Sequence, residues 1–303
     1  MLRVAIQVVV GILIAMAINV VAMLLPRPRN FALRILAVVV SATTLPIPFF
    51  VDAPPAVKTV MATLIGVGFF RVIEAARVPE RLPIGVRILH VLTPLDRAWM
   101  KRVPMGFSFG RYAKGAVFAA IGLGGFIYGS RLAAPTAPYA SLEAWPRWLA
   151  CGAAGYFVFG GFTETSYVPL ELVGWHHGPA QDAPILSQSV GEFWGRRWNR
   201  VIGAWLRRNV FEPFARRRHA RVGLLATFLA SGLLHSYSVL PGSSLVPAIW
   251  IGLFFLLHGG IVMLESALGI ARWPRWRARA FTIGSFVVTV PLFIEPFLRG
   301  LGL

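Results

Sequence analysis

Apolar residues gather into eight stretches along the chain, each roughly 20 residues long, and polar residues gather in the connections between them. A helix needs about 20 mainly apolar residues to cross the hydrocarbon core of a bilayer. The pattern therefore predicts an all-α, polytopic transmembrane protein with about eight membrane helices. We expect these helices at residues 4–25, 31–51, 58–76, 115–131, 148–170, 222–240, 245–266 and 280–299.

The connections alternate between basic and nearly neutral. Those at 77–114 and 171–221 are rich in arginine, whereas the connections at 51–58 and 132–147 carry few charges. Cytoplasmic connections of membrane proteins carry an excess of Lys and Arg. The alternation predicts that both termini lie outside and that the long basic loops are cytoplasmic. Almost all basic residues are arginines, as in GC-rich bacterial genomes, so we expect a bacterial cytoplasmic membrane, or the ER membrane in a eukaryote.

The composition favours a membrane protein over a nucleic-acid-binding protein. Of 303 residues, 56% are hydrophobic and 14% are charged, and the formal net charge is +18. Because the charges lie between apolar stretches, we expect them to contact membrane lipids, and we expect no nucleic acid partner. The single cysteine, Cys151, excludes an intrachain disulfide. No repeat or linker divides the chain, so we expect one integral-membrane domain over residues 1–303.

The stretch GEFWGRRWNRVIGAWLRRNVFEPF, residues 191–214, predicts an amphipathic interfacial helix. Ser189 is a suitable N-cap with Glu192 as its capping-box partner, and Pro213 is expected to end the helix. Tryptophans on one face suit the headgroup zone of the cytoplasmic leaflet, with arginines on the other face. The apolar face holds Trp194, Trp198, Val201 and Trp205, and the basic face holds Arg196, Arg200 and Arg207.

Asn199 lies between the two faces of this predicted helix and is flanked by Gly195 and Gly203. The glycines leave room for another molecule to approach. The spacing is also compatible with a polar residue at the edge of an interfacial helix, so it leaves a structural and a functional role open.

A polar row runs along the stretch RVGLLATFLASGLLHSYSVL. Thr227, Ser231, His235 and Ser238 share one face of a helix. Polar side chains inside a membrane helix must face protein or water, and an ionisable residue at that depth is a candidate functional residue. His235 could equally be a neutral histidine that bridges two helices by hydrogen bonds.

Other ionisable residues carry weaker signals. His258, with Glu265 on nearly the same side of the helix, could line the same cavity as His235, although local pairing is favoured. Glu164 has no obvious partner in the sequence. His235, His258 and Glu265 do not have a spacing that demands a metal, so we expect none. His177 and Asp182 in WHHGPAQDA imitate the histidine-aspartate motif of glycerolipid acyltransferases, without a downstream phosphate-binding motif.

Two blocks together resemble the membrane-bound O-acyltransferase superfamily, and within it the plant-type wax synthase branch. FWGRRWN (193–199) with LRRNVFEP (206–213) is similar to the signature block of that superfamily, and DAPILSQSVGE (182–192) to the lead-in of the branch. ATFLASGLLHSY (226–237) resembles the SGLxHE element that carries the catalytic histidine of the family. The resemblance covers about residues 182–237.

The resemblance implies that His235 is the catalytic histidine and Asn199 the second catalytic polar residue. It also places substrate-binding residues in the same blocks; these are Trp194, Arg196, Arg197, Trp198 and Ser231. One position departs from the pattern, because Ser236 stands where the branch has an acidic residue after the histidine. If that acid orients the imidazole, Glu265 or a backbone carbonyl would have to replace it here.

The implied activity is acyl-CoA-dependent O-acyl transfer to a lipid alcohol, as in wax ester or neutral lipid synthesis. Histidine suits the role of general base at neutral pH, and an asparagine amide can donate to a developing oxyanion. The implied partners are an acyl-CoA donor, a lipid alcohol acceptor and membrane lipids, with no cofactor besides the co-substrate. Acyl transfer to a glycan or another hydroxyl acceptor stays open. A transporter with a buried histidine is disfavoured, because only one strong polar row is found.

Overall fold

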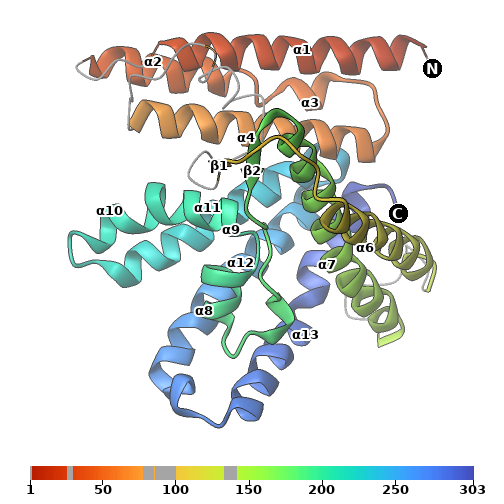
Figure 1. Cartoon of the computed structure of the whole chain (residues 1–303). Helices are drawn as coiled ribbons and strands as arrows, with labels where there is room; N and C mark the ends of the chain where they lie inside the picture. Colours follow the sequence, from red (N-terminus) through yellow and green to blue (C-terminus); the bar gives the residue numbers. More distant parts are fainter. Residues whose placement is uncertain (1, 26–29, 78–84, 86–99, 133–141) are drawn as a thin grey trace. The chain divides into compact units, whose positions relative to one another are not determined.

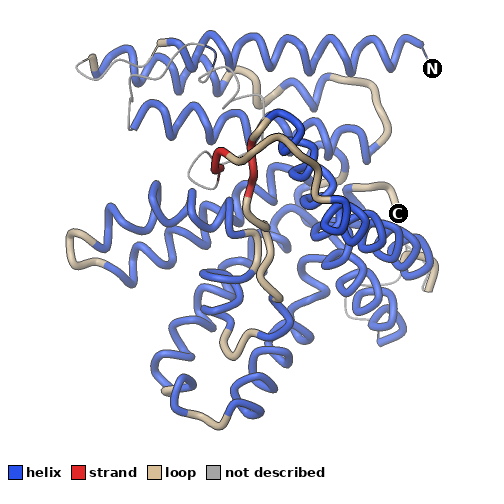
Figure 2. Tube along the Cα trace, in the orientation of Figure 1, coloured by secondary structure: helices blue, strands red, loops and turns tan. Residues whose placement is uncertain are grey.

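The computed structural model describes residues 2–25, 30–77, 85, 100–132 and 142–303. Helices dominate this part of the chain, and the strands that it contains form one short antiparallel pair (Figure 2). The predicted all-α membrane class is confirmed. Arg81, Arg87 and Arg97 of the basic connection lie outside the described residues.

Six helical segments among the described residues are long and apolar enough to cross a membrane. Each coincides with a predicted span. They are α1 (Leu2–Leu24), the segment Phe31–Phe50 with α2 (Phe31–Ala42) and α3 (Ile47–Phe50), α4 (Pro55–Arg77), α11 (Ala220–Val239) continued to Gly242, α12 (Leu245–Leu268) and α13 (Arg275–Gly300).

The predicted spans at 115–131 and 148–170 form helices, but these helices are not among the six. They are α6 (Phe109–Gly129) and α7 (Trp145–Tyr167). Both contain charged side chains near their ends, Arg111 and Lys114 in α6 and Arg147 and Glu164 in α7, which shorten the uncharged stretch. The count of about eight spans is therefore not confirmed.

The chain divides into two compact units. The first comprises Met1–Leu95, Gly232–Gly252 and Pro296–Leu303, and the second comprises Asp96–Ser231 and Leu253–Glu295. Helices α11, α12 and α13 each contribute residues to both units. The expectation of a single domain stays a prediction.

In the first unit, α1, α2 and α4 pack side by side (Figure 1). Their contact is built from the buried apolar side chains of Ala22, Met23, Ala37 and Val72. In addition, Ser41 of α2 donates a buried hydrogen bond to Asn19 of α1. Further hydrogen bonds join segments far apart in sequence. The Tyr237 hydroxyl donates to the Leu45 carbonyl at 2.9 Å, and the Thr59 hydroxyl donates to the Gly300 carbonyl at 2.6 Å.

In the second unit, α6 and α7 form a closely packed hairpin of helices. Small residues let the two backbones approach, as is common between membrane helices. A methyl group added to Gly161 would lie 2.3 Å from the Ala119 backbone nitrogen, and one added to Gly122 would lie 2.4 Å from that of Val158. Strand β1 (Met100–Arg102) pairs with β2 (Trp175–His177), so that Lys101 faces His176.

Short helical turns connect β2 to α11 in the second unit. They are the 3-10 turn Pro184–Leu186, α8 (Val190–Glu192), the π-helical turn Phe193–Arg197, α9 (Arg200–Leu206), the π-helical turn Arg207–Phe211 and α10 (Glu212–Ala215). The predicted continuous helix over 189–213 is thus wrong, because Trp198 is extended and Asn199 has a positive φ of 37°. Pro213 does not end the helix as predicted; it lies in α10, which continues directly from the π-helical turn Arg207–Phe211 to Ala215.

Replacing Gly161 by alanine should destabilise the helix hairpin, because the added methyl group overlaps the backbone of α6. Overpacking of this kind costs about 1–3 kcal/mol, which thermal unfolding of the purified protein in detergent would report. Gly124 of α6 is the matched control, since a methyl group there meets nothing within 4 Å. An unchanged unfolding temperature in the Gly161→Ala variant would show that the two helices do not pack this closely.

Candidate functional site

The segment from Ser189 to Asn199, which we call the signature segment, begins with one half of the predicted capping box, because Glu192 accepts from the Gln188 amide rather than from that of Ser189. Ser189 accepts a hydrogen bond from the Glu192 amide at 2.8 Å, as predicted. The Glu192 carboxylate reaches back to the Gln188 amide at 2.7 Å and pairs with Arg197 at 2.7 Å. Burial opposes ionisation of Glu192, but these contacts outweigh it and lower the pKa of the carboxyl group.

Glu265 of α12 holds the start of the signature segment. Its carboxyl oxygens accept hydrogen bonds from the backbone amides of Val190 and, at 3.0 Å, Gly191. The glutamate is 6% exposed, so these bonds satisfy a carboxyl group that burial would otherwise penalise. Figure 1 shows α8 beside α12 in agreement with these contacts.

The expected local pairing of His258 with Glu265 is therefore wrong. His258 pairs instead with Thr289 of α13, at 3.1 Å between Nε2 and Oγ1. Among the described residues, no group of three or more His, Cys, Asp or Glu could hold a metal ion.

The end of the signature segment is fixed by backbone hydrogen bonds to the loop before it. The Asp182 amide donates to the Arg197 carbonyl, and the Arg200 amide donates to the Ala180 carbonyl, both at 2.9 Å. Arg197 also donates to the Asp182 carbonyl at 3.0 Å. These contacts hold the chain in the turn at Asn199.

Asn199 is the N-cap of α9. Its side-chain oxygen accepts a hydrogen bond from the Ile202 amide at 3.3 Å. Asparagine tolerates the left-handed backbone conformation better than most residues. The cap uses only the oxygen of the side chain, so its NH₂ group remains a hydrogen-bond donor.

The tryptophans of the signature segment pack against protein, contrary to the expected headgroup-facing stripe. Trp198 stacks on Phe193 and Phe159, with ring centroids 5.5 Å and 5.1 Å away. Trp194 lies among aromatic rings of α12 and α13, and Trp205 is 4% exposed. Trp194 and Trp198, which both precede Asn199, thus pack against different helices.

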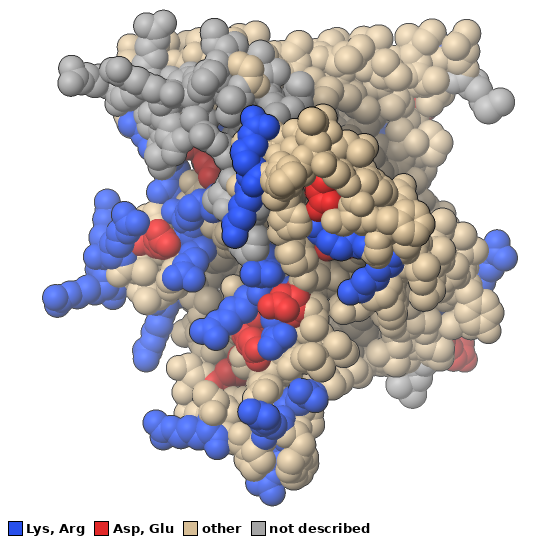
Figure 3. Space-filling model, viewed as in Figure 1, with Lys and Arg blue, Asp and Glu red and all other residues tan. Residues whose placement is uncertain are grey.

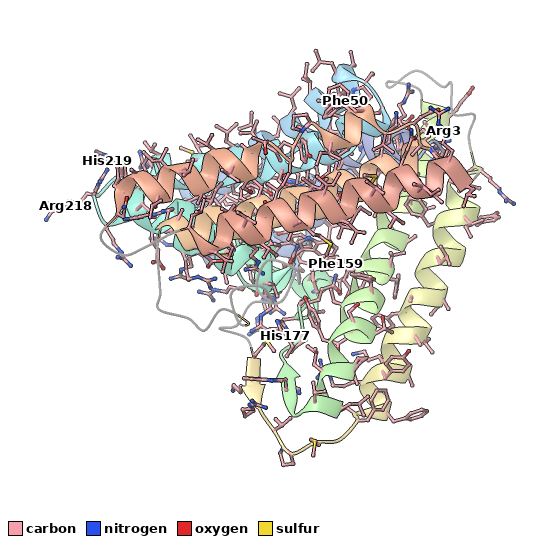
Figure 4. The ribbon with its side chains drawn as sticks, turned by 90° about the horizontal axis from the view of Figure 1, so that it is seen from above. Arg3, Phe50, Phe159, His177, Arg218 and His219 are labelled. Carbon is pink, nitrogen blue, oxygen red and sulfur yellow. The ribbon has the colours of Figure 1, made fainter. Side chains whose placement is uncertain are left out.

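The two arginines predicted to bind substrate differ in their surroundings. Arg197 is engaged by Glu192 and by the Asp182 carbonyl, whereas Arg196 is exposed. Lys and Arg outnumber acidic residues over α10 and its connection to α11 (Figure 3). In that connection Arg218 and His219 point away from the ribbon (Figure 4).

His235 lies on α11 and is half-buried. Along its polar row, Thr227 and Ser238 donate to carbonyls one turn back in the same helix, at 2.7 Å and 2.9 Å. These two hydroxyls thus need no partner from another helix. Ser236, which replaces the expected acid, donates to the Ala248 carbonyl of α12 at 2.6 Å. It ties the two helices together within the first unit.

The remaining sequence candidates have structural partners. Glu164 forms an ion pair with Arg111 at 2.7 Å. Arg111 also contacts Glu171, whose pKa is lowered by the hydrogen bond from Ser108 and by His176. His177 is fully buried against Tyr167 and lies 2.6 Å from the Gly178 carbonyl through Nδ1. This burial argues against a glycerolipid acyltransferase motif, because a catalytic histidine must reach its substrate.

Residues 177–257 match the family model described as "Membrane bound O-acyl transferase family". Three relatives from Arabidopsis thaliana are probable long-chain-alcohol O-fatty-acyltransferases 3, 2 and 7. They are 36%, 35% and 35% identical over 139, 141 and 116 residues, which cover 40%, 42% and 34% of this chain.

The resemblance to the membrane-bound O-acyltransferases is confirmed. The chain spans about two fifths of the length of the first two relatives, 40% and 41%. The family match includes the signature segment, Asn199 and His235. Together with the apolar helices, it supports an integral membrane protein.

Two contacts were not predicted from the sequence. Glu265 accepts hydrogen bonds from the start of the signature segment, and Thr289 is the partner of His258. A signal for Thr289 was present, since Thr282, Ser285 and Thr289 form a row at three- and four-residue spacing within an apolar stretch. For Glu265 no local signal existed, because its partners are backbone amides about 75 positions earlier.

Replacing Glu265 by alanine should release the signature segment from α12. The buried Val190 amide and the partly buried Gly191 amide would lose their acceptor, at a cost of about 1–3 kcal/mol for the buried one. Hydrogen exchange measured by mass spectrometry should become faster in peptides that cover residues 188–199. Glu212→Ala is the control, because Glu212 pairs with the exposed side chains of Arg207 and Arg216. Equal exchange in the Glu265→Ala variant and the unmodified protein would contradict the anchor.

Proposed function

We propose that this protein is a membrane-embedded O-acyltransferase that moves a long-chain acyl group from acyl-CoA to the hydroxyl of a lipid alcohol. The observation that carries the proposal is the family match over residues 177–257, which contains both Asn199 and His235. The names of the matched relatives, long-chain-alcohol O-fatty-acyltransferases, support the acceptor class.

In the proposed reaction, His235 is the general base. The alcohol oxygen attacks the thioester carbonyl carbon while His235 takes the hydroxyl proton. The carbon–sulfur bond of the tetrahedral intermediate then breaks, coenzyme A leaves as a thiolate, and the imidazolium returns the proton to it. A positioned histidine typically contributes about 10²–10⁴-fold to such a step.

Asn199 is the proposed oxyanion donor. The cap on α9 occupies the oxygen of its side chain and thereby fixes which way the amide group is turned. A fixed donor stabilises developing charge more than a mobile one, because it needs no reorganisation during the reaction. The local geometry around Asn199 supports this role for its NH₂ group.

Basic side chains are the proposed contacts of the coenzyme A phosphates. Arg196 is exposed next to the signature segment, whereas Arg197 is already engaged by Glu192. Guanidinium groups bind phosphate oxygens in a bidentate manner. Trp194, Trp198 and Ser231 remain proposed substrate contacts, and the cytoplasmic membrane of a bacterium remains the proposed location.

The proposal is tested with purified protein and labelled long-chain acyl-CoA, offered with a fatty alcohol, diacylglycerol, a sterol or a glycan. We expect a labelled wax ester with the fatty alcohol. His235→Ala should lower turnover by at least about 10²-fold, with unchanged elution on size-exclusion chromatography. A glycan ester would reassign the acceptor, and full activity of a folded His235→Ala variant would remove the histidine from the mechanism.

Asn199→Asp separates the amide chemistry from the helix cap. Aspartate keeps the capping oxygen and tolerates the positive φ, but it has no NH₂ group to donate. Turnover should fall about 10²–10³-fold, the range for loss of an oxyanion donor. Thermal stability should change little. Asn199→Gly is the companion variant, because glycine keeps the backbone conformation without the side chain. An aspartate variant with unchanged turnover would leave Asn199 with a structural role only.

A further inference from the structure

Two buried ring nitrogens near the signature segment have no hydrogen-bond partner among the described residues. They are Nε1 of Trp194 and Nδ1 of His258. Their rings lie 5.7 Å apart between centroids, and His258 is fully buried in α12. Buried polar atoms in native proteins are nearly always hydrogen-bonded, so this pair points to a ligand group that the protein itself does not supply.

The contacts of His258 determine which group fits. Thr289 donates its hydroxyl hydrogen to the Ser285 carbonyl at 2.7 Å, so its oxygen is an acceptor towards His258 Nε2 at 3.1 Å. Nε2 therefore carries the ring hydrogen, and Nδ1 presents a lone pair. The indole nitrogen of Trp194 can only donate. The pair thus offers one donor and one acceptor, which a hydroxyl group satisfies together.

The surroundings of the two nitrogens are aromatic. The ring centroids of Phe254 and Phe286 lie 4.1 Å and 4.8 Å from that of His258. The ring centroid of Phe255 lies 5.5 Å from that of Trp194. Phe254 and Phe255 are 4% and 1% exposed. Apolar side chains around a few placed polar groups are typical of sites for small apolar ligands with one polar end.

We propose that Trp194 and His258 bind the hydroxyl group of a long-chain alcohol, with its first methylene groups among the phenylalanine rings. This inference rests on the proposed function and names the acceptor subsite. The hydroxyl donates to His258 Nδ1 and accepts from Trp194 Nε1. A thioester carbonyl or an alkane has no hydrogen to give to His258, so the pair selects for an alcohol. A site built for a hydroxyl rejects analogues that lack it.

This arrangement is a binding pose rather than the reacting one. The hydroxyl has one hydrogen, and in this pose the hydrogen is given to His258. The alcohol must leave the pose before His235 removes the proton. Trp194 and His258 are thus positioning residues, and their loss should raise the KM for the alcohol more than it lowers kcat.

The test is photo-cross-linking of the purified full-length chain in detergent. The probes are hexadecanol with a diazirine on its chain and hexadecane with the same diazirine. We expect the alcohol to label α12 and the signature segment about tenfold more than the alkane, the order expected for one or two net hydrogen bonds. Equal labelling by the two probes would mean that the nitrogens bind water only, and would overturn the proposal.

Two variants keep an aromatic ring and remove one nitrogen function each. His258→Phe and Trp194→Phe should each bring the ratio of alcohol to alkane labelling close to one. Trp276→Phe is the matched control, since Trp276 is 68% exposed at the start of α13, and its ratio should stay unchanged. If His258→Phe does not fold, as judged by size-exclusion chromatography, Trp194→Phe and the ratio in the unmodified protein decide. If folded Trp194→Phe protein still labels about tenfold more with the alcohol than with the alkane, the hydroxyl is not bound by Trp194.

The binding assay does not depend on acyl transfer, so the two proposals can fail separately. Selective labelling by the alcohol in a protein without acyltransferase activity would support this subsite and overturn the proposed function. Acyl transfer to hexadecanol without selective labelling would support the function and overturn the subsite. In the active protein, a His258→Phe variant should show a raised KM for hexadecanol with little change in kcat. A lowered kcat with an unchanged KM would contradict a role in positioning.

Discussion

The hydrogen bonds from the Val190 and Gly191 amides to the Glu265 carboxyl group fix the start of the signature segment. A carboxyl group in a mostly apolar helix is costly unless hydrogen bonds compensate it. Here two backbone amides donate to the Glu265 carboxyl group. The same bonds hold the start of the signature segment against α12. The same helix carries His258, so the anchor also sets where Trp194 lies relative to that ring. The candidate chemistry of the second unit depends on this contact.

The other end of the signature segment depends on backbone geometry. Hydrogen bonds to Ala180 and Asp182 force a turn at Asn199, and asparagine is among the few residues that both tolerate this turn and cap the following helix. The turn and the cap together give the Asn199 side chain a fixed orientation. Before this turn, Trp194 packs against aromatic rings of α12 and α13, and Trp198 stacks on Phe159 of α7. Local strain and aromatic packing together give the segment its shape.

Sequence reasoning succeeded where the signal was local. The apolar stretches predicted the long helices, and the sequence at Ser189 predicted the N-cap that the structure contains. Sequence reasoning failed where distant backbone groups decide the outcome. Residues 193–207 have ordinary helix propensity, and nothing local predicts that the Arg200 amide bonds to Ala180 instead of continuing the helix. The headgroup-facing tryptophans were wrong for the same reason, since their aromatic partners come from α7, α12 and α13.

In the proposed mechanism, His235 and Asn199 serve one chemical step. The most direct measurement compares acyl transfer from labelled acyl-CoA to hexadecanol by the double variant His235→Ala, Asn199→Asp with transfer by each single variant. Residues that act as a unit show strongly non-additive losses. If the two residues serve one step, the double variant should be no slower than the slower single variant. Losses that multiply would contradict it, because they would mean that the two residues act independently.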